Sequence, residues 1–320
     1  MGPALNVLIV SRKPEPERRQ YYDYVRAKFP AMTVNVVDHH DKVGPYVGSA
    51  DVIMTFNSYI TDDVLRDAPN LKWIHALTTG TDKIDRLPSL RPEVLLTSGR
   101  GIHGAPMSEA ALLAMLALSR KLPIVIRNQD RRAWERPMPR LLEGKTVGIF
   151  GLGVIGSALA PRCKALGMHV IGVDPLKPVV AGVDRVHGWE DATRVIGEMD
   201  FVVIFIPASP KTRGIFNAEL LAAMKPTGYL VNLGRGEVVD DGALIDALRS
   251  GRIAGAALDV FNPEPLPEDH AYWSLPNIII TPHMGGTFDE YPQSALPLFE
   301  ENMRRFLAGD TQHMINLVTH

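Results

Sequence analysis

The sequence has little that would mark a disulfide-stabilised, membrane-spanning or nucleic-acid-binding protein. Its single cysteine, Cys163, excludes an internal disulfide and a cysteine-rich zinc site. Its longest apolar runs, near 110–118 and 201–208, fall well short of the ~20 residues of a spanning helix. The 34 basic and 36 acidic residues leave a net charge of −2, so no general positive field would attract nucleic acid or an anionic membrane. The first residues do not read as a signal peptide, so we expect a cytoplasmic protein.

What the sequence does contain is an alternation of short β-branched runs with amphipathic stretches. Such an alternation predicts βαβ units and mainly parallel sheets, and 320 residues suffice for two cores. A first series of strands is expected at 6–10, 33–37, 52–55, 73–76 and 95–97. A second is expected at 146–150, 169–173, 201–206, 229–233, 255–258 and 278–281, followed by a helix at 293–307. We therefore predict two doubly wound α/β domains, with residues 100–286 inserted into a domain made of 1–99 and 287–320.

A glycine loop of the form GxGxxG, residues 151–156, follows the strand predicted at 146–150 and opens a helix. Gly151 permits the tight turn, Gly153 lets backbone N–H groups approach a pyrophosphate, and Gly156 lets helix and strand pack closely. The alternative is a glycine-rich turn without a ligand. The surrounding strand, helix and acidic strand end favour dinucleotide binding and a Rossmann domain.

The acidic residue is Asp174, at the end of the next predicted strand. Its carboxylate can accept hydrogen bonds from ribose hydroxyls and would repel a 2′-phosphate, which favours NAD over NADP. Lys177 would offset part of that repulsion. Alternatively, Asp174 and Pro175 only begin a turn.

Three further strand ends carry side chains suited to chemistry on a small anion. Arg235 suits a carboxylate, although an ion pair within its own loop is the alternative. Asp259 would hold a nicotinamide amide or cap a turn. Glu264 alone would be a solvated loop acid, and His283 alone a structural residue. Together Arg235, Glu264 and His283 supply a cation, a carboxylate and an acid/base group, which predicts an active site.

Residues 38–41, Asp-His-His-Asp, have the composition of a metal site. Neighbouring side chains on a strand point to opposite faces, however, and Gly44-Pro45 marks a turn soon afterwards. We therefore predict no metal.

These motifs resemble the D-isomer-specific 2-hydroxyacid dehydrogenase family, and the similarity covers nearly the whole chain. It rests on the glycine loop, on Asp174, and on segments 232–236, 259–266, 273–277 and 281–283. About 150 residues precede the glycine loop, which also agrees with this family. Segment 101–120 and Trp134 look most like the glyoxylate and hydroxypyruvate reductase branch.

The resemblance implies a flavodoxin-like substrate domain, catalysis by Arg235, Glu264 and His283, and a substrate carboxylate held by the backbone of Thr79 and Gly80. It implies NAD rather than NADP as cofactor. The expected cofactor contacts are Gly151, Gly153, Val154, Ile155, Gly156, Asp174, Pro207, Thr212, Leu233, Gly234, Asp259 and Gly285.

The implied reaction is hydride transfer between nicotinamide C4 and substrate C2, and we expect the protein to act as a 2-ketoacid reductase. His283 would donate the proton and Glu264 would stabilise its imidazolium form. We expect a homodimer through 108–122 and a substrate cleft between the two domains that closes on binding. A corepressor-type module that senses NAD(H) with little turnover is the alternative, but the intact triad favours the enzyme.

Overall fold

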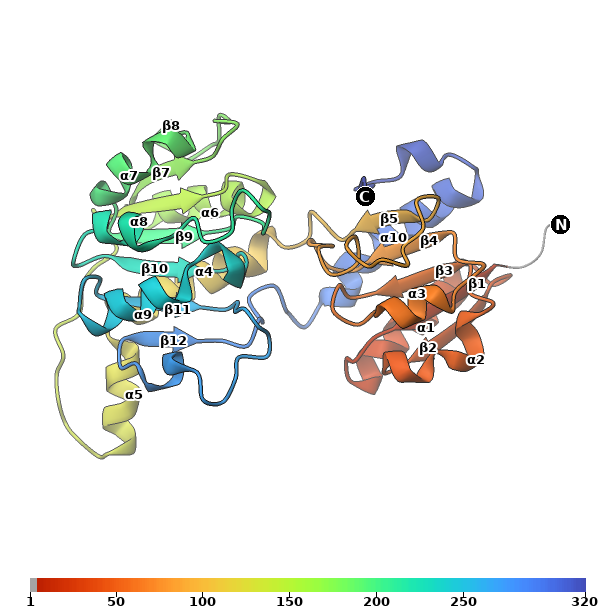
Figure 1. The fold of residues 1–320 in the computed structure, drawn as a ribbon, viewed down its shortest axis with the longest axis horizontal. Helices are drawn as coiled ribbons and strands as arrows, with labels where there is room; N and C mark the ends of the chain where they lie inside the picture. The colour runs from red at the N-terminus through yellow and green to blue at the C-terminus, as the bar shows by residue number, and fades with distance from the viewer. Residues whose placement is uncertain (1–4) are drawn as a thin grey trace. The chain divides into compact units, whose positions relative to one another are not determined.

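The computed structural model describes residues 5–320, which form two compact units, coloured along the chain in Figure 1. The first unit comprises 5–102 and 288–320, and the second comprises 103–287. The chain passes between the units after residues 102 and 287. The sequence predicted these crossings after residues 99 and 286, which is three residues and one residue earlier. Residues 1–4 of the expected first domain lie outside the described residues.

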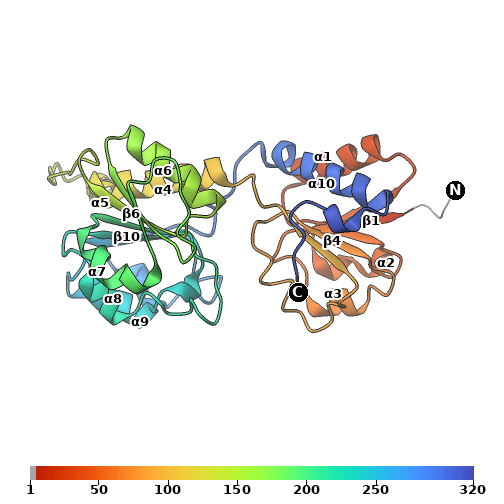
Figure 2. The same ribbon diagram turned by 90° about the horizontal axis from the view of Figure 1, so that it is seen from above.

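The first unit is a five-stranded parallel sheet in the order β2-β1-β3-β4-β5. Alternate residues of β1 face opposite layers, with Val7 and Ile9 toward α1 and α10, and Leu8 and Val10 toward α2 and α3. Figure 2 shows the two helical layers of this unit on either side of its sheet. The strands are β1 (Asn6–Val10), β2 (Thr33–Val37), β3 (Val52–Thr55), β4 (Trp73–Ala76) and β5 (Leu95–Ser98), and the helices α1 (Glu15–Lys28), α2 (Gly44–Val47), α3 (Asp62–Arg66) and α10 (Tyr291–Leu307).

The second unit is a seven-stranded parallel sheet in the order β12-β11-β10-β9-β6-β7-β8. Helices α4 and α6 cover one face, and α7, α8 and α9 cover the other. The strands are β6 (Thr146–Phe150), β7 (His169–Val173), β8 (Arg185–His187), β9 (Phe201–Ile204), β10 (Tyr229–Asn232), β11 (Gly255–Leu258) and β12 (Ile278–Ile280). The helices are α4 (Gly104–Ser119), α5 (Leu122–Asp130), α6 (Val154–Ala165), α7 (Ala192–Val195), α8 (Ala218–Ala223) and α9 (Asp241–Arg249).

The predicted fold class, two doubly wound parallel α/β domains, is confirmed, and the differences lie at element ends. The second sheet has seven strands rather than six, because β8 pairs with β7 at the edge. The helix expected over 108–122 is α4, which begins at Gly104 and ends at Ser119, and α5 follows it as a separate helix. In residues 5–320 no helix is long and apolar enough to cross a membrane.

Both sheets are parallel, so the carboxyl ends of the strands in each sheet meet along one edge. In open α/β folds this edge is where ligands bind. Every polar residue selected from a strand end in the sequence should therefore lie on such an edge of its own unit, and the site is built from there.

Candidate active site

The glycine loop joins β6 to α6 as the motif predicts, and its three glycines meet different surroundings. Gly151 has a φ of +97°, and a Cβ on Gly156 would lie 2.0 Å from the Gly151 carbonyl oxygen, so these two are required by backbone geometry. A Cβ on Gly153 would meet nothing within 4 Å. Helix α6 begins at the next residue without a side-chain cap. The space beside Gly153 and the uncapped N–H groups fit the phosphates of a dinucleotide.

Asp174 follows β7 and both of its carboxylate oxygens accept backbone hydrogen bonds. One accepts from the Leu152 amide of the glycine loop and the other from the Leu176 amide, each at 2.9 Å. The hydrogen bond from the Leu176 amide forms the turn that the sequence offered as the alternative to ribose binding. The hydrogen bond from the Leu152 amide fixes the carboxylate beside the glycine loop. Asp174 therefore joins the end of β7 to the site predicted for the cofactor.

The loop after β10 is organised by Asn232, which is 1% exposed. Its side chain accepts from the Gly234 amide and donates to the Arg235 carbonyl. A Cβ on Gly234 would lie 2.7 Å from the Ile206 carbonyl oxygen, so only glycine fits there. The adjoining loop is closed by the Thr212 hydroxyl, which donates to the Pro207 carbonyl at 2.7 Å. The half-buried Arg235 thus leaves the sheet edge from a tightly held backbone.

The Asp259 carboxylate, predicted to hold a nicotinamide amide or to cap a turn, forms hydrogen bonds within a turn. It is 2% exposed and accepts from the Thr281 hydroxyl at 2.5 Å, from the Met284 amide at 2.9 Å and from the Gly285 amide at 2.8 Å. Its carbonyl accepts from the His283 amide at 2.8 Å. Asp259 therefore fixes the turn that carries His283, which agrees with the turn-cap alternative.

His283 and Glu264, predicted to act together, lie in direct contact. The His283 Nδ1 atom is 2.9 Å and 3.0 Å from the two Glu264 carboxylate oxygens. One of these oxygens also accepts from the Phe261 amide at 3.1 Å. The His283 side chain is 48% exposed, against 21% for Glu264. The carboxylate orients the ring through Nδ1, so Nε2 is the nitrogen left to exchange a proton with a substrate.

Two residues with a clear structural role were not predicted to have one. Asn232 and Thr281 lie inside motifs that were recognised, but neither was assigned a function. The signal was their position, because each is a polar residue at the end of a buried apolar strand. Such residues organise the loops from which Arg235 and His283 project.

Thr79 and Gly80 belong to the first unit, where they follow β4 at the carboxyl edge of its sheet. The Thr78 hydroxyl donates to the Gly80 carbonyl at 2.8 Å, which closes a short turn around Thr79. Both residues are half-buried. The structure therefore places them on a sheet edge, as expected for a ligand-binding loop.

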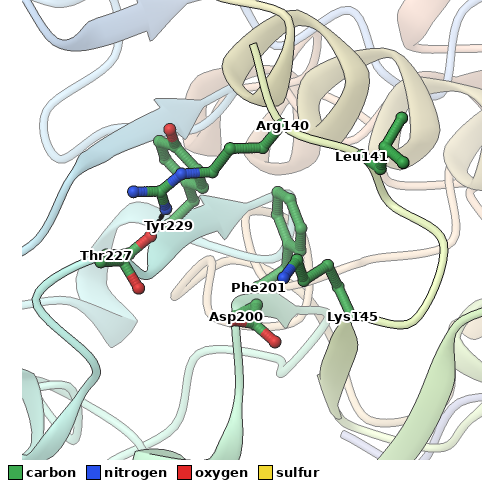
Figure 3. Close-up of a pocket in the computed structure, with 7 residues that line it drawn as sticks. All are labelled: Arg140, Leu141, Lys145, Asp200, Phe201, Thr227 and Tyr229. Carbon is green, nitrogen blue, oxygen red and sulfur yellow. Dashed lines mark hydrogen bonds between the residues drawn. The ribbon is translucent and has the colours of Figure 1, made fainter. Parts of the chain in front are cut away.

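A partly open pocket of about 250 Å³ lies at the opposite edge of the second sheet. Figure 3 shows that Lys145, Asp200 and Thr227, which line it, all come from segments leading into strands. Arg140 donates to the Thr227 carbonyl across this pocket at 2.8 Å. Because α/β sheets bind ligands at their carboxyl edge, we do not assign this pocket to the active site.

Cys163 does not contribute a nucleophile. It is fully buried in α6, and burial raises the pKa of its thiol to about 12. The thiolate would therefore be scarce at neutral pH.

The fold and the glycine loop define a nucleotide-binding α/β protein, and comparison with known proteins gives the family. Residues 112–285 match the family model for the D-isomer specific 2-hydroxyacid dehydrogenase, NAD binding domain. The chain belongs to this family, which confirms the resemblance seen in the sequence.

The matched region makes up a different share of each relative's own chain. A D-3-phosphoglycerate dehydrogenase of Methanocaldococcus jannaschii is 34% identical over 85% of this chain but only 52% of its own length. The chain thus spans about half the length of the curated relatives it matches first. A solved D-isomer specific 2-hydroxyacid dehydrogenase family protein of Aeromonas salmonicida has a TM-score of 0.89, 31% identity and 98% coverage of both chains. An NADPH-dependent glyoxylate/hydroxypyruvate reductase of Sinorhizobium meliloti, solved with NADP and sulfate, has a TM-score of 0.85, 27% identity and 98% coverage of both chains.

The buried Asp259 leads to a first prediction. Asp259→Asn replaces one acceptor oxygen by an amide donor, which faces either the Thr281 hydroxyl or the backbone amides of the turn. We expect a loss of roughly 1.5–3 kcal/mol in the free energy of unfolding, measured by urea titration. The exposed Asp246→Asn on α9 is the control and should leave the midpoint unchanged. An unchanged midpoint in Asp259→Asn would show that the turn does not depend on this carboxylate.

Proposed function

We propose that the protein is an NAD-dependent D-2-hydroxyacid dehydrogenase that acts as a 2-ketoacid reductase. The observation that supports this best is the contact of His283 with Glu264 at 2.9 Å. This pair of side chains lies on the same sheet edge as the loop of Arg235 and the glycine loop. A half-buried carboxylate holding an exposed imidazole is an arrangement suited to proton transfer.

A bound nicotinamide coenzyme would supply the hydride, and the residues of this chain would do the rest. The Arg235 guanidinium would bind the substrate carboxylate and polarise the 2-oxo group, because its planar fork of N–H donors matches a carboxylate. His283 would deliver a proton from Nε2 to the developing alkoxide, and the Glu264 carboxylate would stabilise the imidazolium. Thr79 and Gly80 remain the proposed backbone donors to the substrate carboxylate.

The proposed coenzyme is NAD, because of Asp174. Its carboxylate is fixed beside the glycine loop by the Leu152 amide, where it would accept from ribose hydroxyls and repel a 2′-phosphate. Lys177 is engaged with Glu190 at 2.5 Å, so its charge is partly compensated. The S. meliloti reductase was solved with NADP, which makes the choice between the two coenzymes a question for experiment.

The alternative is an NAD(H)-sensing module with little turnover. Cofactor binding by the glycine loop would serve both functions equally. A sensing protein has no need of an acid/base pair whose turn is held by a buried carboxylate, so Asp259, Glu264 and His283 favour the enzyme. NADH consumption with a panel of small 2-ketoacids, glyoxylate and hydroxypyruvate among them, tests the proposal. NADH binding without turnover of any of them would favour the sensor.

We also propose that the protein is a homodimer through the second unit. One side of α4 packs on α6, yet Leu113 is 64% and Leu116 is 42% exposed. The neighbouring α5 exposes further apolar side chains, at Leu122, Ile124, Val125 and Ile126. Exposed apolar side chains gathered on two neighbouring helices are typical of a subunit interface.

The role of His283 gives a second prediction. His283→Ala should lower the turnover of the 2-ketoacid substrate by ~10² to 10⁴, because the proton donor is lost. NADH binding, measured by fluorescence titration, should stay close to that of the wild type. His169→Ala, at the amino end of β7, is the control. Near-native turnover in His283→Ala would remove this residue from catalysis.

A third prediction concerns Asp174. Asp174→Asn keeps an acceptor for the backbone but removes the negative charge, and Asp174→Ala removes both. In either variant kcat/KM for NADPH should rise relative to NADH by about tenfold, which corresponds to 1.4 kcal/mol. A wild-type enzyme that already uses the two coenzymes equally well would refute the assignment.

The apolar surface of α4 gives a fourth prediction. Leu113→Glu with Leu116→Glu places two charges on that surface and should convert a dimer to a monomer, as measured by light scattering after size exclusion. Leu307→Glu, an exposed leucine of the first unit, is the control. A wild-type monomer at micromolar concentration, or a double variant that stays dimeric, would contradict the proposal.

A further inference from the structure

The first unit has a ligand-binding edge of its own, at the point where its strand order reverses. In the order β2-β1-β3-β4-β5, the chain goes from β1 to β2 on one side and returns to β3 on the other. Ligands of open α/β sheets bind in the crevice outside such a switch point. Here β1 is followed by Ser11, Arg12 and Lys13, and β3 by the loop from Phe56 to Tyr59.

A shallow, open pocket of about 470 Å³ lies at this edge, where β1 and β2 end, and its lining is rich in ionised side chains. The lining residues are Arg12, Arg18, Asp38, His39, Asp41 and Lys42. Lys42 pairs with Asp38 at 2.8 Å, and Asp41 is 3.1 Å from both His39 and His40. The two acidic groups are therefore already engaged.

The two arginines of the pocket have neutral partners. The Arg12 guanidinium is 2.9 Å from His40 Nδ1, and the Arg18 guanidinium donates to the Lys13 carbonyl at 2.6 Å. Within residues 5–320, neither has a carboxylate at ion-pair distance. Two guanidiniums without a carboxylate at ion-pair distance, at the carboxyl edge of the sheet where β1 and β2 end, suit an anion.

Arg12 is held in place before any ligand arrives. Its guanidinium lies 5.3 Å from the centroid of the Tyr59 ring. The centroids of the Tyr59 and Phe56 rings are in turn 5.2 Å apart. The contact with His40 engages one of the five N–H donors of the guanidinium. Stacking and this contact reduce the rotamer entropy that a ligand would otherwise have to remove.

The same cluster must be weighed as a metal site, because ligand atoms of His39, His40 and Asp41 lie within 4.8 Å of one another. The sequence analysis assumed that residues 38–41 lie on a strand. This assumption is wrong, because β2 ends at Val37 and residues 40–42 form a 3₁₀ helix. A divalent cation would nevertheless lie among Arg12, Arg18 and Lys42. That charge opposes a metal ion and favours an anion.

This arginine site and the Thr79 loop lie on one sheet edge within one unit. Strand β3 separates β1 from β4, so the two loops leave strands about 10 Å apart. Asn57, in the loop after β3, accepts from the Lys83 amide at 3.0 Å and so ties that loop to the one containing Thr79. A small molecule with anionic groups at both ends can span such an edge.

We propose that Arg12, with Arg18 beside it, binds a second anionic group of the substrate, a carboxylate or a phosphate at the end remote from the 2-oxo group. This rests on the proposed function and on Thr79 and Gly80 as the anchor of the first carboxylate. The preferred substrates are accordingly 2-oxo diacids or phosphorylated 2-oxo acids rather than glyoxylate or pyruvate.

The test is steady-state kinetics at saturating NADH with four 2-oxo acids: glyoxylate, pyruvate, 2-oxoglutarate and 3-phosphohydroxypyruvate. The wild type should favour at least one of the last two in kcat/KM, and which one it favours distinguishes carboxylate from phosphate. Arg12→Gln should raise KM for that substrate roughly 10- to 100-fold, as expected for a lost charged hydrogen bond. It should change the constants for glyoxylate less than twofold. Arg12→Lys should restore part of the loss, and Arg18→Gln should have a smaller effect in the same direction.

Arg19→Gln is the matched control, because Arg19 lies on α1 next to Arg18 but pairs with Asp23 at 3.0 Å on the surface. It should leave all four substrates unchanged. A wild type that prefers glyoxylate or pyruvate, or an Arg12→Gln variant that loses all four equally, would overturn the subsite and leave the proposed reaction intact. Failure to reduce any of the four would overturn the proposed reaction and the subsite with it.

Discussion

The carboxylate of Asp259 is the constraint on which the geometry of the candidate active site depends. It is buried, and it accepts from one hydroxyl and two backbone amides of the turn that follows β12. That turn holds His283 at a φ of +51°, a left-handed conformation that costs a non-glycine residue ~1–3 kcal/mol. The hydrogen bonds to Asp259 offset this cost. The backbone of His283 is thereby fixed, and its ring lies against Glu264.

Much of this site could be predicted because a parallel sheet gathers the ends of its strands. Arg235, Asp259 and His283 were each selected as polar residues closing an apolar run, and β10, β11 and β12 are adjacent in the sheet. For Asp259 the sequence offered two roles, a nicotinamide ligand and a turn cap, and did not distinguish them. A carboxylate at a strand end suits a ligand or a turn equally well, and only the hydrogen bonds of the folded chain distinguish the two.

Most strands have the predicted bounds, because short β-branched and apolar runs separated by turn residues mark them clearly. These are β1, β2, β3, β4, β6, β7 and β11, whereas β9 and β10 end earlier than predicted. β8 was missed because it lies at the sheet edge, where Arg185 and His187 need no burial. The start of α4 was placed too late because Gly104 and Pro106 are weak helix formers, although proline is accepted in a first turn. The conformation of residues 38–41 was predicted wrongly, because these residues were assumed to lie on a strand although β2 ends at Val37.

The two units offer different groups to anionic ligands, and both kinds of group act locally. The net charge of the chain therefore does not reveal its sites for anions. In the second unit the space beside Gly153 and the uncapped N–H groups of α6 offer backbone dipoles, which suit phosphates without any side-chain charge. In the first unit Arg12 and Arg18 provide full charges beside acids that are already paired. A chain with a net charge of −2 can therefore still offer local groups for small anions where strands end, and such local sites do not depend on the overall charge.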